Sequence, residues 1–225
     1  YDDPMAEALL RKGYDSYTAL LEHRRNAAGD DGGAASQALN YSLAQYPWAE
    51  FNFFHTMKSG TGIDLAPAWP HVAYFPEYIY WNRLPGNRLF GMGDVYHITN
   101  KIPTGLLNLH MNQIVHFYRE HEPDYAAFAK WMTQYFERNH NRDFPWARFL
   151  LTNAGGDLEP KAPPADKPLA RHFENMGQVI MQSGGGDDDT YALFAAGGEL
   201  SQHKHFDNNN FIIYNYISNV SSVDS

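Results

Sequence analysis

The sequence predicts an α+β protein in which helices occupy the first part of the chain and an antiparallel β-sheet occupies the last part. Apolar residues recur at a helical period through the first 150 residues. Two short β-like runs follow, at 177–184 and 190–198, and Gly and Asp residues separate them. Between the two patterns lies a stretch rich in proline and glycine, which favours neither helix nor strand. We therefore predict a helical domain over 1–152, a linker over 153–169 and a strand domain over 170–225.

The helical part begins with two predicted helices. In residues 5–21 the apolar side chains keep a helical period, and the glycines in 29–33 end this helix. The second stretch, residues 41–57, is very aromatic and is closed by Gly60 and Gly62. Each pattern is typical of a helix.

Two more helices follow in the same part of the chain. Residues 106–118 place Leu107, Met111 and Tyr118 on one face. Asp124 is predicted to be the N-cap of the next helix, which carries Phe128. Helices joined in series in this way are typical of a toroid of paired helices.

Composition and charge narrow the classes of function. With 44% hydrophobic residues in 225, the chain can bury a sizeable core. Its net charge of −9 argues against nucleic-acid binding, because neutralising phosphates requires a basic face. No apolar run approaches the roughly 18 residues of a membrane span. Since the chain opens at Tyr1 and stops within a predicted sheet at Ser225, we expect it to be part of a longer protein.

The most informative motif is the pair His203 and His205 in a β-like segment, where residues two apart point to the same face. Three blocks occur in order, HFENMGQVIMQSG, DTYALFAAGG and HKHFDNNNFIIY. Together they resemble the start of the β-sandwich domain of heparinase II/III-like polysaccharide lyases. The resemblance implies an (α/α) toroid of helices followed by an antiparallel β-sandwich, incomplete in this sequence, with the active site between them.

The same resemblance implies β-elimination next to a uronic acid. The C5 proton is removed and the glycosidic oxygen at C4 leaves, so the site needs a group that neutralises the carboxylate and a proton shuttle. The family pattern makes Asn40 the candidate neutraliser, Tyr96 the base and acid, and His203 their partner on the strand side. Asn40 also fits an N-cap. Because an ordinary Tyr has a pKa of about 10, its phenolate needs nearby donors or cations, and His97 and Arg88 are candidates.

A structural zinc ion is also implied by the resemblance. His205 would be one ligand, and Asp224 would be a second ligand from the next strand. In the absence of cysteine, zinc is bound by His and carboxylate groups. The third protein ligand of the family is a later His, which lies beyond residue 225. The acidic run 187–189 follows three glycines and is interpreted as a solvated turn instead of a calcium site.

Several residues are candidates for contact with the substrate. Arg83 and Arg88 could bind carboxylate or sulfate groups, with His97 beside the second of them. Trp81 could stack on a sugar ring. The family acts on uronate polymers such as alginate, heparin and heparan sulfate, and the resemblance implies a secreted or periplasmic protein.

Two other classes of function compete with a lyase. A carbohydrate-binding protein could keep the same architecture without turnover. The pattern His203, His205, Asp207 also opens the metal site of metallo-β-lactamase-like hydrolases, in which zinc activates water. That motif needs a further His where this chain has Asn208, and its fold alternates strands with helices.

Overall fold

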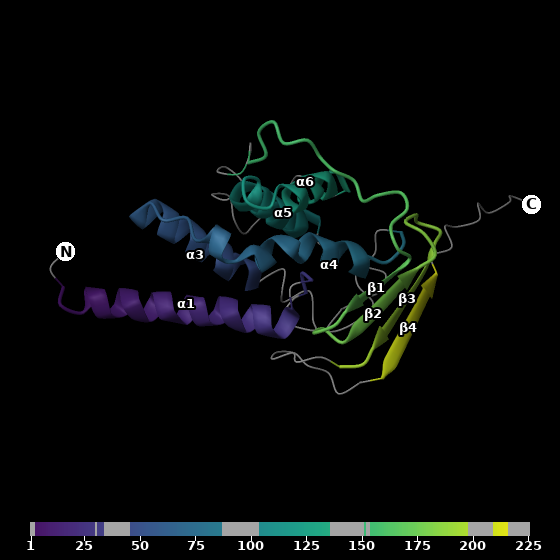
Figure 1. The fold of residues 1–225 in the computed structure, drawn as a ribbon, viewed down its shortest axis with the longest axis horizontal. Coiled ribbons are helices and arrows are strands. Elements are labelled where there is room, and N and C mark those ends of the chain that lie inside the picture. Colours follow the sequence, from purple (N-terminus) through teal and green to yellow (C-terminus); the bar gives the residue numbers. More distant parts are fainter. Residues whose placement is uncertain are drawn as a thin grey trace, which may run out of the picture.

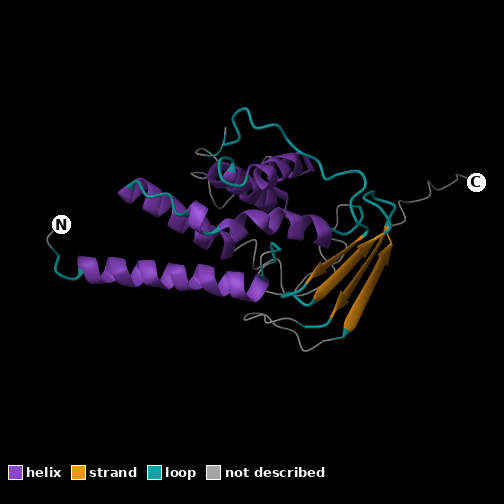
Figure 2. Ribbon diagram, viewed as in Figure 1, coloured by secondary structure: helices purple, strands orange, loops and turns teal. Residues whose placement is uncertain are grey.

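The computed structural model describes residues 3–29, 31–33, 46–86, 104–135, 151, 154–197 and 209–215. In Figures 1 and 2 the helices come first along the chain and the strands last. The helices are α1 (Ala6–Ala28), α3 (Tyr46–Thr61), α4 (Phe75–Asn82), α5 (Thr104–Tyr118) and α6 (Pro123–Met132), with 3-10 turns at Ala66–Ala68, Pro70–Tyr74 and Thr133–Tyr135. The strands are β1 (Ala170–Phe173), β2 (Gln178–Gln182), β3 (Thr190–Ala195) and β4 (Asn210–Asn215). The predicted α+β class with an antiparallel sheet is confirmed.

Glycines end the first two helices close to where the sequence predicts. Gly29 has a φ of 74°, and its N–H donates to the carbonyl of Arg25 at 2.9 Å. Helix α3 ends at Thr61, between the two glycines predicted to close it, and the N–H of Gly62 donates to the carbonyl of Lys58 at 3.1 Å. Glycine suits both closing positions because it adopts a positive φ without steric cost.

The predicted apolar face of α5 is buried, and its members are Leu107, Met111, Ile114, Val115 and Tyr118. The predicted start of α6 is wrong. The helix begins at Pro123 after Glu122, so Asp124 lies in its first turn and is not the N-cap. Proline suits the first helical position because the N–H that it lacks would have no partner inside the helix. Asp124 instead accepts a hydrogen bond from Nζ of Lys161 at 2.7 Å.

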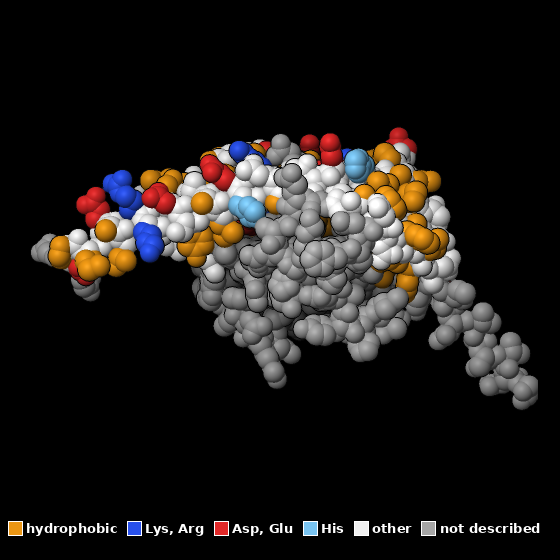
Figure 3. Space-filling view, turned by 90° about the horizontal axis from the view of Figure 1, so that it is seen from below, with side chains coloured by type: hydrophobic (Ala, Val, Ile, Leu, Met, Phe, Trp, Pro, Cys, Tyr) orange, Lys and Arg blue, Asp and Glu red, His pale blue; other side chains and the backbone are white. Residues whose placement is uncertain are grey.

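The sheet is an antiparallel meander in the order β1-β2-β3-β4. Ile180, Leu193 and Ile212 pair across three strands and face the helices. On the opposite face, Met181 pairs with Ala192, which pairs with Ile213. Ile213 is 68% exposed, and Figure 3 shows hydrophobic side chains gathered at this end of the molecule. One face of the sheet is therefore packed against the helices, and the other is apolar and open.

The sheet and the helices share one apolar core, to which α1, α3, α4, α5, α6 and the inner face of the sheet contribute. The joint runs through α4. The hydroxyl of Tyr78 donates to Oε1 of Gln178 at 2.9 Å, and the ring of Phe173 meets the ring of Tyr78 edge-on at 5.0 Å between centroids. Residues 154–169 connect the two parts without a helix or strand. None of the helices in the described ranges combines the length and apolar character needed to cross a bilayer.

Candidate functional site

Trp81 and Arg83 are the predicted site residues that the structure describes, and they lie at the end of α4. The other predicted site residues lie outside the described residues: Asn40, Arg88, Tyr96, His97, His203, His205 and Asp224. Their catalytic, substrate-binding and metal-binding roles therefore stay predictions. Among the described residues, no three His, Cys, Asp or Glu side chains are grouped to hold a metal ion.

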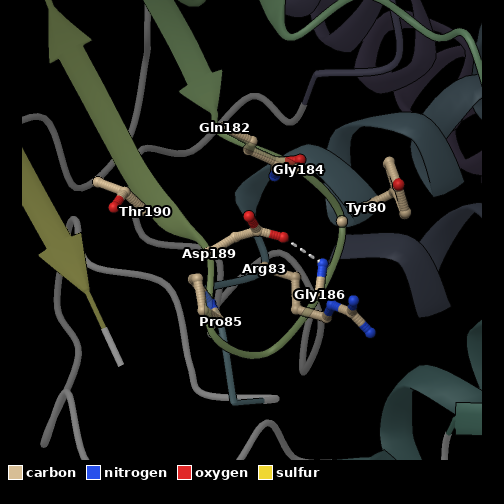
Figure 4. A pocket seen from close by; sticks show the side chains of 9 residues that line it. Tyr80, Arg83, Pro85, Gln182, Gly184, Gly186, Asp189 and Thr190 are labelled. Atoms are coloured by element: carbon tan, nitrogen blue, oxygen red, sulfur yellow. Dashed lines mark hydrogen bonds between the residues drawn. The ribbon is translucent and has the colours of Figure 1, made fainter. Parts of the chain in front are cut away.

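A small pocket opens where the end of α4 meets the turn between β2 and β3 (Figure 4). We call it the turn pocket, and we call residues 183–189 the glycine turn. The wall is formed by Tyr80, Arg83, Pro85, Gln182, Gly184, Gly185, Gly186, Asp189 and Thr190. The cavity volume is about 20 Å³. This is room for one or two water-sized groups.

The glycine turn is held closed by Asp189. One carboxylate oxygen accepts the N–H of Gly186 at 2.6 Å, and the other accepts the hydroxyl of Ser183 at 2.8 Å. The Ser183 hydroxyl in turn accepts the N–H of Thr190 at 2.9 Å. These hydrogen bonds hold the pKa of Asp189 below its ordinary value, so the carboxylate is charged at neutral pH. A Cβ at position 184 would lie 2.6 Å from that carboxylate, which explains the glycine there.

On the helix side, Lys167 lies over the aromatic rings beside the turn pocket. Its ammonium is 5.2 Å from the ring centroid of Tyr80 and 4.6 Å from the ring of Trp81, and it donates to Oε1 of Gln182 at 3.4 Å. Trp81 is only 6% exposed. Its indole therefore lacks the open face that stacking on a sugar ring requires, contrary to the prediction. Arg83 is half-buried and lines the pocket.

A second polar cluster is enclosed within the helical part. Arg24 of α1 forms an ion pair with Glu50 of α3, and both side chains are buried. His71 and His110 are buried nearby, and their ring nitrogens have no hydrogen-bond partner among the described residues. Burial, reinforced by the charge of Arg24, lowers the pKa of both, to about 3 for His71. These imidazoles are neutral at pH 7 and belong to the interior of the protein.

A third group joins α3 to α5. Nε2 of His55 and Oε1 of Gln113 are 2.8 Å apart, and the rings of His55 and His116 stack with centroids 5.4 Å apart. Burial, followed by the charges of His55 and Lys58, lowers the pKa of His116 to about 4. Both rings are half-buried and uncharged at neutral pH, so this pair stabilises the contact between the two helices without adding positive charge.

The sequence pattern indicated Arg83 but not the remaining wall of the turn pocket. Tyr80 and Gly185 stand far apart in the chain, and no local pattern predicts that they meet. The acidic run 187–189 is the visible signal of the turn, because Asp in a glycine-rich segment commonly accepts hydrogen bonds from its own backbone.

No protein-family model matches the chain, and no curated protein sequence matches it. A solved structure of heparinase III is similar to it, with 18% sequence identity and a TM-score of 0.55. The match covers 88% of this chain and 28% of the heparinase III chain. The chain therefore has a fold similar to part of heparinase III, and it spans little more than a quarter of that protein.

Proposed function

We propose that this protein is a polysaccharide lyase that cleaves an anionic, uronic-acid-containing polysaccharide by β-elimination. The observation that carries the proposal is the fold likeness to heparinase III over 88% of the chain. It is supported by the three sequence blocks in the order that the lyase family uses. The segregation of helices from an antiparallel sheet also argues against the metallo-β-lactamase alternative, which requires alternating strands and helices.

The proposed reaction uses Asn40, Tyr96 and His203. Hydrogen bonds from Asn40 neutralise the uronate carboxylate, which makes the C5 proton more acidic. Tyr96 or His203 takes that proton, and the electron pair left at C5 forms the C4–C5 double bond. The bond from C4 to the glycosidic oxygen breaks, and Tyr96 protonates the departing oxygen.

We propose that zinc has a structural role and takes no part in the reaction. His205 and Asp224 would hold the ion as two of its protein ligands, with a third from outside this sequence. A bound zinc ion would fix the segment that carries His205 and so orient His203, because residues two apart in an extended segment share a face.

The fold proposal is that the sheet is half of a β-sandwich above an (α/α) toroid. The open apolar face of the sheet supports it, because Phe211 and Ile213 are 67% and 68% exposed. Two sheets in a sandwich pack their apolar faces about 10 Å apart. The proposed cleft would then lie between helices and sandwich, and the family further implies a secreted or periplasmic location.

The test follows the ultraviolet absorbance of the unsaturated product when the full-length protein meets alginate, heparan sulfate, heparin and chondroitin sulfate. We expect absorbance to rise with at least one polymer. Tyr96→Phe should lower kcat at least 100-fold, because general acid-base catalysis contributes about 10²–10⁴-fold. Tyr14→Phe is the matched control, since its ring is exposed on α1.

Unchanged turnover in Tyr96→Phe would refute the role given to Tyr96. Flat absorbance with all four polymers, together with retained sugar binding, would instead favour a carbohydrate-binding protein without lyase activity.

A further inference from the structure

The turn pocket brings together two parts of the chain that are distant in sequence. Tyr80 and Arg83 come from the end of α4, whereas Gly185 and Asp189 come from the glycine turn (Figure 4). The joint behind the pocket is fixed, because Nε2 of Gln182 donates to the carbonyl of Trp81 at 3.2 Å. This hydrogen bond fixes the two walls of the pocket relative to each other.

The chemistry of the walls is mixed. The guanidinium of Arg83 can only donate hydrogen bonds, whereas the charged carboxylate of Asp189 can only accept them. A hydroxyl group both donates and accepts, so it can satisfy both walls at once. A carboxylate or sulfate group only accepts, and in this pocket it would meet the like charge of the Asp189 carboxylate. The charge distribution of the turn therefore favours a neutral hydroxyl over an oxyanion.

The size of the pocket agrees with this choice. A cavity volume of about 20 Å³ admits one or two groups of the size of water. An added Cβ at Gly185 would lie 3.6 Å from the phenolic oxygen of Tyr80, so the space between these two residues holds little more than one such group.

We infer that the turn pocket is a subsite that takes a hydroxyl group of one sugar residue of the polysaccharide. This inference rests on the proposed function, and it adds a specificity-determining contact. Arg83, for which the sequence predicted a carboxylate or sulfate partner, donates to the sugar hydroxyl, and Asp189 accepts from it. The glycine turn leaves the space for that group.

Gly185→Ala tests the subsite with little risk to the fold. Among the described residues, the added methyl group meets only the Tyr80 oxygen, at an ordinary contact distance, and it takes up space in the pocket. Gly60→Ala is the matched control, because a Cβ there meets no atom of the described residues within 4 Å. The Tm of each variant should stay within a few degrees of the Tm of the wild type.

With the polymer that the wild type cleaves, we expect Gly185→Ala to raise KM about 5- to 10-fold, which is the low end of the loss for the two hydrogen bonds of the hydroxyl. The value of kcat should stay within about twofold, because the contact is made in both ground state and transition state. Gly60→Ala should leave both unchanged. An unchanged KM in Gly185→Ala would overturn the subsite while leaving the lyase proposal intact.

Salt dependence separates a hydroxyl from an oxyanion. The KM ratio of variant to wild type should be the same at about 50 mM and about 300 mM sodium chloride, because a hydroxyl contact is little screened. A ratio that falls steeply with salt would overturn the hydroxyl assignment in favour of an oxyanion on Arg83.

If the wild type cleaves none of the four polymers, the lyase proposal fails, and calorimetric binding of the same polymers decides the subsite. Binding that Gly185→Ala weakens about 5- to 10-fold supports the subsite. Equal binding by the variant, or no binding by the wild type, overturns it.

Discussion

Replacing Glu50 with glutamine tests whether a buried ion pair holds α1 against α3. Glu50 is 1% exposed and Arg24 is 4% exposed, and the Arg24 guanidinium also lies 5.3 Å from the ring centroid of Phe75. Glutamine keeps the shape of the side chain but removes its charge. Because arginine cannot lose its proton in a protein, the variant leaves an uncompensated charge in the core.

The expected cost is about 3–5 kcal/mol, the range measured when one partner of a buried pair is removed. This is a large part of the free energy of unfolding of a folded domain, which is roughly 5–15 kcal/mol. For a chain of this length, each kcal/mol lowers Tm by about 2–4 °C, so we expect a fall of roughly 6–20 °C. Urea denaturation followed by circular dichroism measures the free energy of unfolding directly.

The control is the pair of Lys58 and Asp64 at the surface, in which Lys58 is exposed and Asp64 is half-buried, with Nζ and Oδ2 2.7 Å apart. Asp64→Asn should cost about 0–1 kcal/mol, because solvent reaches this pair and screens it. If Glu50→Gln proves unable to fold, Arg24→Met combined with Glu50→Leu should restore the folded state, since it removes both charges. A cost for Glu50→Gln no larger than that for Asp64→Asn would refute the reasoning.

Two further predictions concern the joint with the sheet and the response to acid. Tyr78→Phe should lower the free energy of unfolding by about 1–3 kcal/mol in urea denaturation, because the buried amide oxygen of Gln178 loses this donor. Tyr17→Phe, at an exposed position of α1, is the control. Equal effects of the two substitutions would contradict the prediction. The pKa of His71 is about 3 in the folded state and about 6.5 in the unfolded state. Below pH 6.5 the unfolded state therefore binds a proton that the folded state does not bind. The contribution of neutral His71 to stability is fully present above pH 6.5 and is lost as the pH falls toward 3. Between pH 7 and 4.5 the protonation of His71 in the unfolded state should lower the free energy of unfolding by about 2–3 kcal/mol. Urea denaturation at both pH values should show a decrease smaller by that amount in His71→Gln. The same decrease in variant and wild type would rule out this role.

The parts of the fold that the sequence predicted correctly are those that local patterns control. The face of α5 follows from a helical period, which fixes the buried side whatever covers it. The ends of α1 and α3 follow from glycines, which adopt a positive φ at low cost. The start of α6 was missed because two local rules competed, and proline at the first helical position prevailed over the capping preference of Asp124.

Helix α4 was not predicted, because its eight residues are too few for a helical period to stand out. Most of its residues are buried, namely Phe75, Pro76, Tyr78, Ile79, Trp81 and Asn82, whereas Glu77 and Tyr80 are half-buried. A short and largely buried stretch is compatible with a strand as well as with a helix. The same burial explains why Trp81, a suitable residue type for sugar stacking, is packed inside.

By itself, the sequence determined the order of helices and strands, the antiparallel class of the sheet and the resemblance to a lyase family. Only the tertiary structure decided which distant segments meet. It paired Arg24 with Glu50, placed Tyr78 on Gln178 and joined Arg83 to the glycine turn in one pocket. The physical reason is that periodicity and turn residues act over a few positions of the backbone, whereas a pocket or a buried ion pair depends on contacts through space.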